Sequence, residues 1–108
     1  MANEDKGTWH RVAAASEIRD NEPKHVKVNE LSIALYRVDG AIHAIDDVCT
    51  HEFALLSEGY QDGDTIECPL HQAVFHIPTG EVRSAPAEEN LRTYPVKIEG
   101  DDVLVLVD

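Results

Sequence analysis

Short runs of apolar residues, separated by turn-forming residues, recur along most of the chain. His25–Val28 alternates polar and apolar positions, and Thr8–Val12 is a comparable run. Alternation with a period of two is typical of a half-buried β-strand. Because the runs are short and turn chemistry separates them, the pattern predicts an all-β chain with a sandwich or barrel-like architecture.

One pair of runs has a strong signal for a β-hairpin. Leu31–Val38 and Ala41–Ile45 lie on either side of Asp39-Gly40. An Asp-Gly pair between apolar runs favours a two-residue turn, because both turn positions need a positive φ. We therefore expect these two runs to pair as antiparallel neighbours.

A second hairpin is predicted at the C-terminal end. Thr93–Ile98 and Val103–Val107 flank a turn at Gly100–Asp102. Pro95 has no backbone N–H for a sheet ladder, so we expect it at an edge strand or at the start of a strand. Only Ala13–Asp20 has a composition that allows a helix, of one or two turns.

The charge of the chain limits its partners. The 108 residues include 21 acidic and 9 basic side chains, a formal net charge of −12. Nucleic acids and anionic lipid surfaces repel such a chain, and the same repulsion between copies favours a monomer.

The polar start of the chain does not resemble a secretory signal, and no apolar run approaches the ~20 residues that span a bilayer. With only two cysteines, the chain is expected to be a single cytoplasmic domain without disulfides.

The stretch from Val38 to Val82 differs in composition from both ends. It has no Lys or Arg, but it holds nine acidic residues, both cysteines and four of the six histidines. Glycines and prolines interrupt its strand signals. We expect a loop-rich insert carried on a β-sheet base.

Two short Cys/His pairs in this stretch are the candidate chemistry. Cys49 and His51 form a C-x-H pair, Cys68 and His71 form a C-x-x-H pair, and sixteen residues separate the two pairs. Unrelated buried thiols and polar histidines, or a structural zinc site in a binding module, are alternatives. Cys2His2 zinc sites usually place like ligands together. A Rieske [2Fe-2S] centre has two Cys on one iron and two His on the other, which favours a mixed pair on each loop.

The chain resembles the Rieske-type ferredoxins of bacterial aromatic-ring-hydroxylating dioxygenase systems. The resemblance covers nearly the whole chain and rests on the two pairs and on flanking segments in the same order: Leu56–Gly59, Glu67–His71, Phe75, Thr79-Gly80 and Ser84–Ala87. It implies one Rieske domain over residues 1–108, an antiparallel β-sandwich base at about 1–45 and 85–108, and a loop-rich cluster-binding subdomain at about 46–84. It also implies one [2Fe-2S] cluster, covered on a third side by the proline loop at Ser84–Ala87. The implied ligands are Cys49, His51, Cys68 and His71.

The resemblance also implies a function in the catabolism of aromatic hydrocarbons. The chain would not be an enzyme itself but a one-electron carrier. Electrons would arrive from an NAD(P)H-dependent flavoprotein ferredoxin reductase and leave to a terminal Rieske non-haem iron oxygenase. Alternatively, the chain would be the Rieske subunit of another reductase or monooxygenase. Neither nucleic acid nor a membrane is an expected partner.

One departure from more distant Rieske proteins bears on the reduction potential. Rieske proteins of respiratory and photosynthetic complexes have an extra, disulfide-bonded cysteine in each ligand loop, where this chain has Ala54 and Leu70. Hydrogen bonds to the sulfurs raise a cluster's potential and nearby negative charge lowers it. Few evident donors and many local acids predict a potential near the low end of the Rieske range, about −150 mV.

The remaining histidines and the aromatic residues are expected to have structural roles. His10 and His25 are expected at the surface, His43 to point out of its sheet, and His76 on the polar face of a strand at Val74–Ile77. We also expect Leu56, Leu70 and Val74 to form an apolar shell around the cluster. The aromatic residues expected in the core are Trp9, Tyr36, Phe53, Tyr60, Phe75 and Tyr94.

Overall fold

The structure is a computed structural model that describes residues 7–48, 54–69, 73–84 and 89–107. Nearly all of its regular structure is extended, as the short alternating runs predict. In chain order the elements are β1 (Thr8–Ala14), the 3-10 turn η1 (Ala15–Glu17), β2 (Lys24–Val28), β3 (Leu31–Val38), β4 (Ala41–Asp46), the 3-10 turn η2 (Leu56–Glu58), β5 (Tyr60–Asp62), β6 (Thr65–Glu67), β7 (Val74–His76), β8 (Val82–Ser84), β9 (Thr93–Tyr94), β10 (Val96–Glu99) and β11 (Asp102–Val107).

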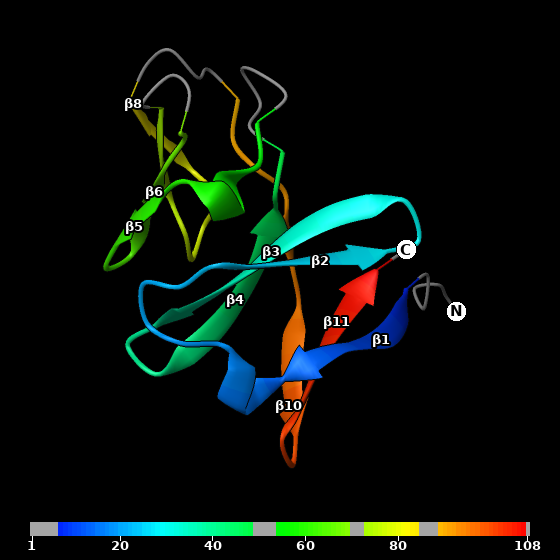
Figure 1. Cartoon of the computed structure of the whole chain (residues 1–108). Helices are drawn as coiled ribbons and strands as arrows, with labels where there is room; N and C mark the ends of the chain where they lie inside the picture. The colour runs from blue at the N-terminus through cyan, green and yellow to red at the C-terminus, as the bar shows by residue number, and fades with distance from the viewer. Residues whose placement is uncertain (1–6, 49–53, 70–72, 85–88, 108) are drawn as a thin grey trace.

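The strands form three antiparallel sheets (Figure 1). The first has the order β1-β11-β10, the middle one β2-β3-β4-β9, and the third β5-β6-β7-β8. The first two sheets contain the two ends of the chain, and the third is built only from residues 60–84. The antiparallel all-β fold is therefore confirmed.

The middle sheet is buried on both faces, and β3 lies at its centre. Ile33 and Leu35 pack into one apolar cluster with residues of β1 and β11. Ala34 and Tyr36 point the other way, into a second cluster with residues of β6 and β7. Successive side chains of a strand alternate between faces, so β3 joins the two-sheet base to the third sheet. Its run of four fully buried residues has no polar alternation for this reason.

Both predicted hairpins form. The β3–β4 turn has positive φ at Asp39 and Gly40 (51° and 84°), as its sequence requires. The predicted C-terminal strand is divided at Pro95: β9 pairs at the edge of the middle sheet, whereas β10 pairs at the edge of the first sheet. The prediction that Pro95 marks an edge or a strand start is confirmed, but the single strand over Thr93–Ile98 was wrong. A proline between two ladders leaves no ladder hydrogen bond unmade.

Two other expectations need correction. The predicted helix is only the three-residue turn η1, because Ala13 and Ala14 continue β1 against β11. Tyr36, Phe75 and Tyr94 are buried, but Trp9 and Tyr60 are exposed, at 36% and 66%. Trp9 is covered on one side by Lys97, whose Nζ lies 4.5 Å from the ring centroid. Tyr60 lies on β5, the free edge of the third sheet. Phe53 is outside the described residues.

The third sheet gives the middle of the chain more regular structure than its composition indicates. Each of its four strands has only three residues. Of these, only the strand at Val74–Ile77 is predicted from the sequence, since three residues are too few to show a period. In the parts of the chain that the structure describes, no helix is long and apolar enough to span a membrane.

Candidate metal centre

Cys68 is the predicted ligand that the structure describes. It directly follows β6, is fully buried, and has a free thiol. Its side chain belongs to the apolar cluster that includes Ala54, Leu56 and Phe75. Cys49, His51 and His71, and also the shell residue Leu70, lie outside the described residues. Leu56 is buried and Val74 half-buried.

The segments that carry the two Cys/His pairs are closed at their bases. Val48 and Leu55 form an antiparallel bridge on either side of residues 49–54. The N–H of Cys68 donates to the carbonyl oxygen of Ala73 at 2.8 Å, across residues 69–72. Ala54, Cys68 and Ala73 pack in the same buried cluster. The described ends of both segments therefore meet at one end of the molecule (Figure 1).

Asp47 lies beside the first segment and was missed as a site residue by the sequence analysis. It is fully buried, unlike every other charged side chain that the structure describes. Its carboxylate accepts hydrogen bonds from the N–H and the hydroxyl of Ser57, each at 2.7 Å. It also accepts one from Nδ1 of His25 at 2.7 Å. The ring of His25 carries a hydrogen on this nitrogen, because a carboxylate can only accept. The predicted position of His25 at the surface is confirmed, since its side chain is 37% exposed, and the ring also binds this buried anion.

A third segment approaches the same region from the C-terminal side. Gly80, with φ +75°, accepts a hydrogen bond from the N–H of Leu91 at 2.7 Å. A Cβ at this position would lie 2.3 Å from the carbonyl oxygen of Leu91. Leu91 packs in the cluster that holds Cys68. The side chain of Asn90 accepts from the N–H of Val82 across residues 85–88. The predicted proline loop, Ser84–Ala87, lies outside the described residues except for the backbone of Ser84.

The two other histidines of the middle stretch are not arranged as ligands. Nδ1 of His76 lies 2.8 Å from Oγ1 of Thr79, and Nε2 lies 3.1 Å from Oδ2 of Asp64. Burial, and then the charge of nearby His76, lower the pKa of His43. His43 lines a groove of about 460 Å³ together with Ile77 and residues of β9 and β10. Among the described residues no group of three His, Cys, Asp or Glu side chains is placed to hold a metal ion.

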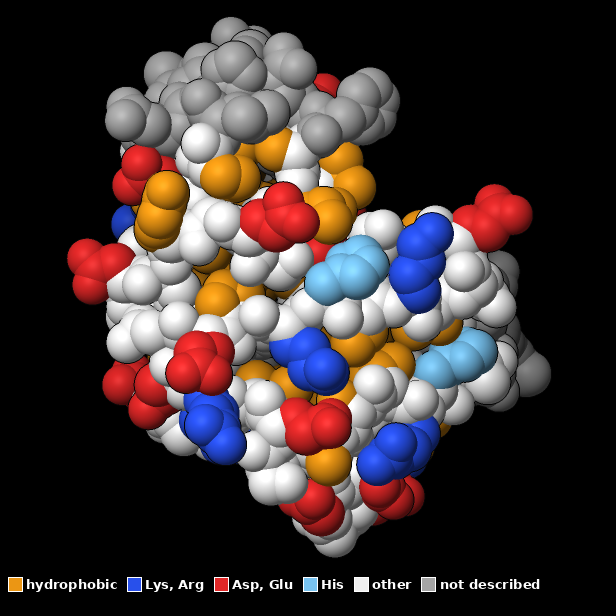
Figure 2. Space-filling model, in the orientation of Figure 1, with side chains coloured by type: hydrophobic (Ala, Val, Ile, Leu, Met, Phe, Trp, Pro, Cys, Tyr) orange, Lys and Arg blue, Asp and Glu red, His pale blue; other side chains and the backbone are white. Residues whose placement is uncertain are grey.

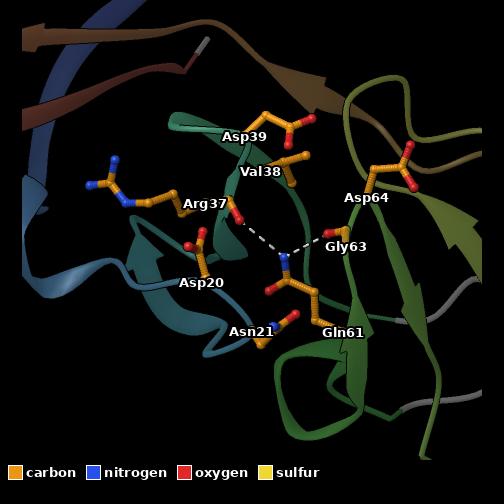
Figure 3. Close-up of a pocket in the computed structure, with 8 residues that line it drawn as sticks. All are labelled: Asp20, Asn21, Arg37, Val38, Asp39, Gln61, Gly63 and Asp64. Atoms are coloured by element: carbon orange, nitrogen blue, oxygen red, sulfur yellow. Dashed lines mark hydrogen bonds between the residues drawn. The ribbon is translucent and has the colours of Figure 1, made fainter.

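A second hollow, of about 410 Å³, lies between the β3–β4 hairpin and the β5–β6 turn (Figure 3). Nε2 of Gln61 donates across it to the carbonyl oxygens of Arg37 and Gly63. The guanidinium of Arg37 turns away from the hollow and donates to the carbonyl oxygens of Ile18 and Ala15. Of these contacts, the hydrogen bond from Gln61 to the carbonyl oxygen of Arg37 joins the third sheet to the base.

Tyr36 places a phenol hydroxyl in the apolar cluster of side chains that includes Cys68. It is fully buried, and its hydroxyl has no hydrogen-bond partner among the residues the structure describes. Burial, and then the negative charge of Asp47, raise its pKa well above the ordinary value for tyrosine. The hydroxyl therefore stays protonated and remains a potential donor.

The surroundings of Cys68 fit an iron–sulfur cluster. A buried cysteine in an apolar environment is shielded from water, and the neighbouring segments are held by backbone hydrogen bonds at their bases. A rigid frame and a dry shell are what the protein supplies to such a group. When bound, the cluster would accept and release one electron at a time.

The chain belongs to the Rieske [2Fe-2S] domain family, whose sequence profile matches residues 8–95. The naphthalene 1,2-dioxygenase system ferredoxin component of Pseudomonas putida is 44% identical over 97 residues, which are 90% of this chain and 93% of that protein. Sphingomonas yanoikuyae B1 ferredoxin superimposes with a TM-score of 0.88 at 38% identity, covering 91% of this chain and 97% of that one. A chain from the complex of reduced oxygenase and oxidized ferredoxin in carbazole 1,9a-dioxygenase gives 0.84 at 39% identity, covering 90% and 91%.

These similarities confirm the predicted family, the Rieske-type fold, the single [2Fe-2S] cluster, and the function as an electron carrier rather than an enzyme. They do not support the zinc-stabilised binding module, because the matched family is defined by an iron–sulfur cluster. The assignment of Cys49, His51, Cys68 and His71 as ligands stays a prediction.

Proposed function

We propose that this protein carries single electrons from an NAD(P)H-dependent flavoprotein reductase to the terminal Rieske non-haem iron oxygenase of an aromatic-ring-hydroxylating system. The observation that carries the proposal is the buried thiol of Cys68 between two closed segments, in a chain that matches dioxygenase ferredoxins over nearly their full length. The similarity to a ferredoxin and oxygenase complex supports the oxygenase as the electron acceptor. We place the protein in the cytoplasm, as a monomer.

The proposed ligands divide into an inner and an outer pair. Cys49 and Cys68 would hold one iron, and His51 and His71 the other. Burial of Cys68 supports placing the thiolate-bound iron on the inside. The histidine-bound iron would then be the outer one and the shortest route for an electron. Residues 46–84 would form the cluster-binding subdomain, carried by a base of residues 1–45 and 85–108.

Charge supports brief encounters with basic partner surfaces. The third sheet and the turns next to it expose four acidic side chains, Glu58, Asp62, Asp64 and Glu81. Figure 2 shows acidic side chains over the upper left of the molecule, where the third sheet lies. Long-range attraction speeds association without making the complex long-lived. That property suits a carrier that must leave each of its two partners quickly.

Reconstitution with a candidate reductase and oxygenase tests the proposed route. The reductase should reduce the protein and the oxygenase should reoxidise it. Both rates should fall as salt rises, because the screening length shortens from about 10 Å at 0.1 M to about 3 Å at 1 M. Rates that do not depend on salt would contradict the electrostatic steering. Reoxidation by a different reductase or monooxygenase, with none by the oxygenase, would instead favour a Rieske subunit of that other enzyme.

A pair of histidine variants tests the ligand set. His71→Ala should abolish the Rieske electron-resonance signal of the reduced protein. His76→Ala is the matched control, because His76 contacts Thr79 and Asp64 instead. It should leave the signal in place. An unchanged signal in His71→Ala would remove that residue from the ligand set.

A further inference from the structure

The buried carboxylate of Asp47 is the structure's strongest feature that the proposed function does not use. Asp47 follows β4 and precedes the predicted ligand Cys49 by two positions. Burying an ionised group is costly unless it is paired and hydrogen-bonded. The hydrogen-bond partners of Asp47 therefore identify the parts of the chain that this carboxylate connects.

The contacts of Asp47 connect the base to the turn that follows the first ligand segment. On the base side, its N–H donates to the carbonyl oxygen of Ser32 at 3.0 Å, and its carboxylate accepts from His25 of β2. On the other side, its carbonyl oxygen accepts from the N–H of Leu56 at 2.7 Å. Its carboxylate accepts twice from Ser57, within η2. Asp47 therefore holds residues 47 and 56–57 together, just outside the bridge between Val48 and Leu55.

We propose that Asp47 is a positioning residue that closes the base of the first ligand segment, residues 49–53, and thereby fixes Cys49 and His51 for the cluster. This inference rests on the proposed ligand set. Three donors converge on one carboxylate: the N–H and hydroxyl of Ser57, and Nδ1–H of His25. Hydrogen bonds to an ionised acceptor are shorter and stronger than neutral ones.

An asparagine has the shape of Asp47 but not its charge. With its oxygen kept on the N–H of Ser57, its amide group would turn N–H donors toward the Ser57 hydroxyl and Nδ1 of His25. Both groups would then have to accept instead of donate, and the stronger bonds to an ionised acceptor would be lost. Groups that orient metal ligands typically change metal affinity by roughly 10- to 100-fold when they are removed. We expect the affinity of the protein for its [2Fe-2S] cluster to fall by the same factor when Asp47 is replaced.

The test measures the rate at which a strong chelator removes iron from the purified holoprotein. Asp47→Asn should release iron roughly 10- to 100-fold faster than the unmodified protein. It should also shift the electron-resonance signal of the reduced cluster, which a purely structural role would leave unchanged. Asp62→Asn is the matched control, because it removes the same charge from an exposed position on β5. It should release iron at the original rate.

Two serine variants keep the test decisive if Asp47→Asn fails to fold. Ser57→Ala removes one donor to the carboxylate and leaves the backbone donor in place, so it should accelerate iron release by a smaller factor. Ser57→Thr keeps the hydroxyl and should release iron more slowly than Ser57→Ala. Release from Ser57→Ala at the original rate, or equal acceleration in Asp62→Asn and Asp47→Asn, would overturn the proposal. If the unmodified protein held no cluster, the proposed function itself would fail instead.

Discussion

Gly59 offers a direct test of how the third sheet positions Cys68. Gly59 follows η2 with φ −91° and ψ −150°, an extended conformation that other residues can adopt. A Cβ at this position would lie only 2.0 Å from the carbonyl oxygen of Glu67, the residue before Cys68. Real Cβ contacts essentially never fall below 3.0 Å. Gly59→Ala must therefore move the end of β6 away from residue 59 by at least 1.0 Å, the difference between these two distances.

The energetic cost follows from the same geometry. Overpacking of this kind costs typically 1–3 kcal/mol, so we expect a loss of about 2 kcal/mol in the free energy of unfolding. For a domain of this size that lowers the melting temperature by about 8 °C, at roughly 4 °C for each kcal/mol. The displaced backbone carries Cys68, so iron should also leave the cluster faster and the electron-resonance signal should broaden.

Gly63→Ala is the matched control on the same hairpin. Gly63 has φ +63°, and a Cβ there would meet nothing within 4 Å. The variant should lose about 1 kcal/mol from the strained conformation alone, with iron release and signal unchanged. Thermal unfolding and chelator-driven iron release of both variants are the assays. If Gly59→Ala released iron as slowly as Gly63→Ala, the idea that this contact fixes the position of Cys68 would be refuted.

Two further predictions concern buried polar groups of the core and the groove. Tyr36→Phe removes a hydroxyl that has no partner among the described residues, so urea unfolding should show unchanged stability or a gain of about 1 kcal/mol; a loss of that size would reveal a partner for the hydroxyl. The pKa of His43 is lower in the folded protein than its ordinary value of 6.5, through burial and the charge of His76. The unfolded chain therefore binds more protons in this range, and stability should fall as the pH drops below about 6.5. His43→Gln should reduce this loss, and an identical pH profile in the variant would contradict the assignment.

Local chemistry made much of the fold predictable from the sequence. The Asp39-Gly40 turn needs only its own two residues to select a positive φ, and the strands beside it are long enough to show their pattern. The two Cys/His pairs are likewise local, since the spacing within each pair is set by a few residues. These local features are sufficient to indicate the family.

Other features depend on contacts between distant segments and leave no local signal. Nothing in the sequence distinguishes Asp47 from the other acidic residues of the middle stretch, and its burial depends on His25 and Ser57, which lie 22 and 10 residues away. Strands of three residues, such as β5, are too short to show a period. Tyr60 was expected in the core because aromatic residues usually pack there, but its strand is the free edge of the third sheet.

One Rieske cluster is the electron-carrying group of this chain. The most direct test is the content of iron and acid-labile sulfide in anaerobically purified protein, measured together with the electron-resonance spectrum after reduction. We expect two irons and two sulfides in each chain, as the [2Fe-2S] family requires, and a Rieske-type signal. Zinc in place of iron, or iron without sulfide, would contradict it.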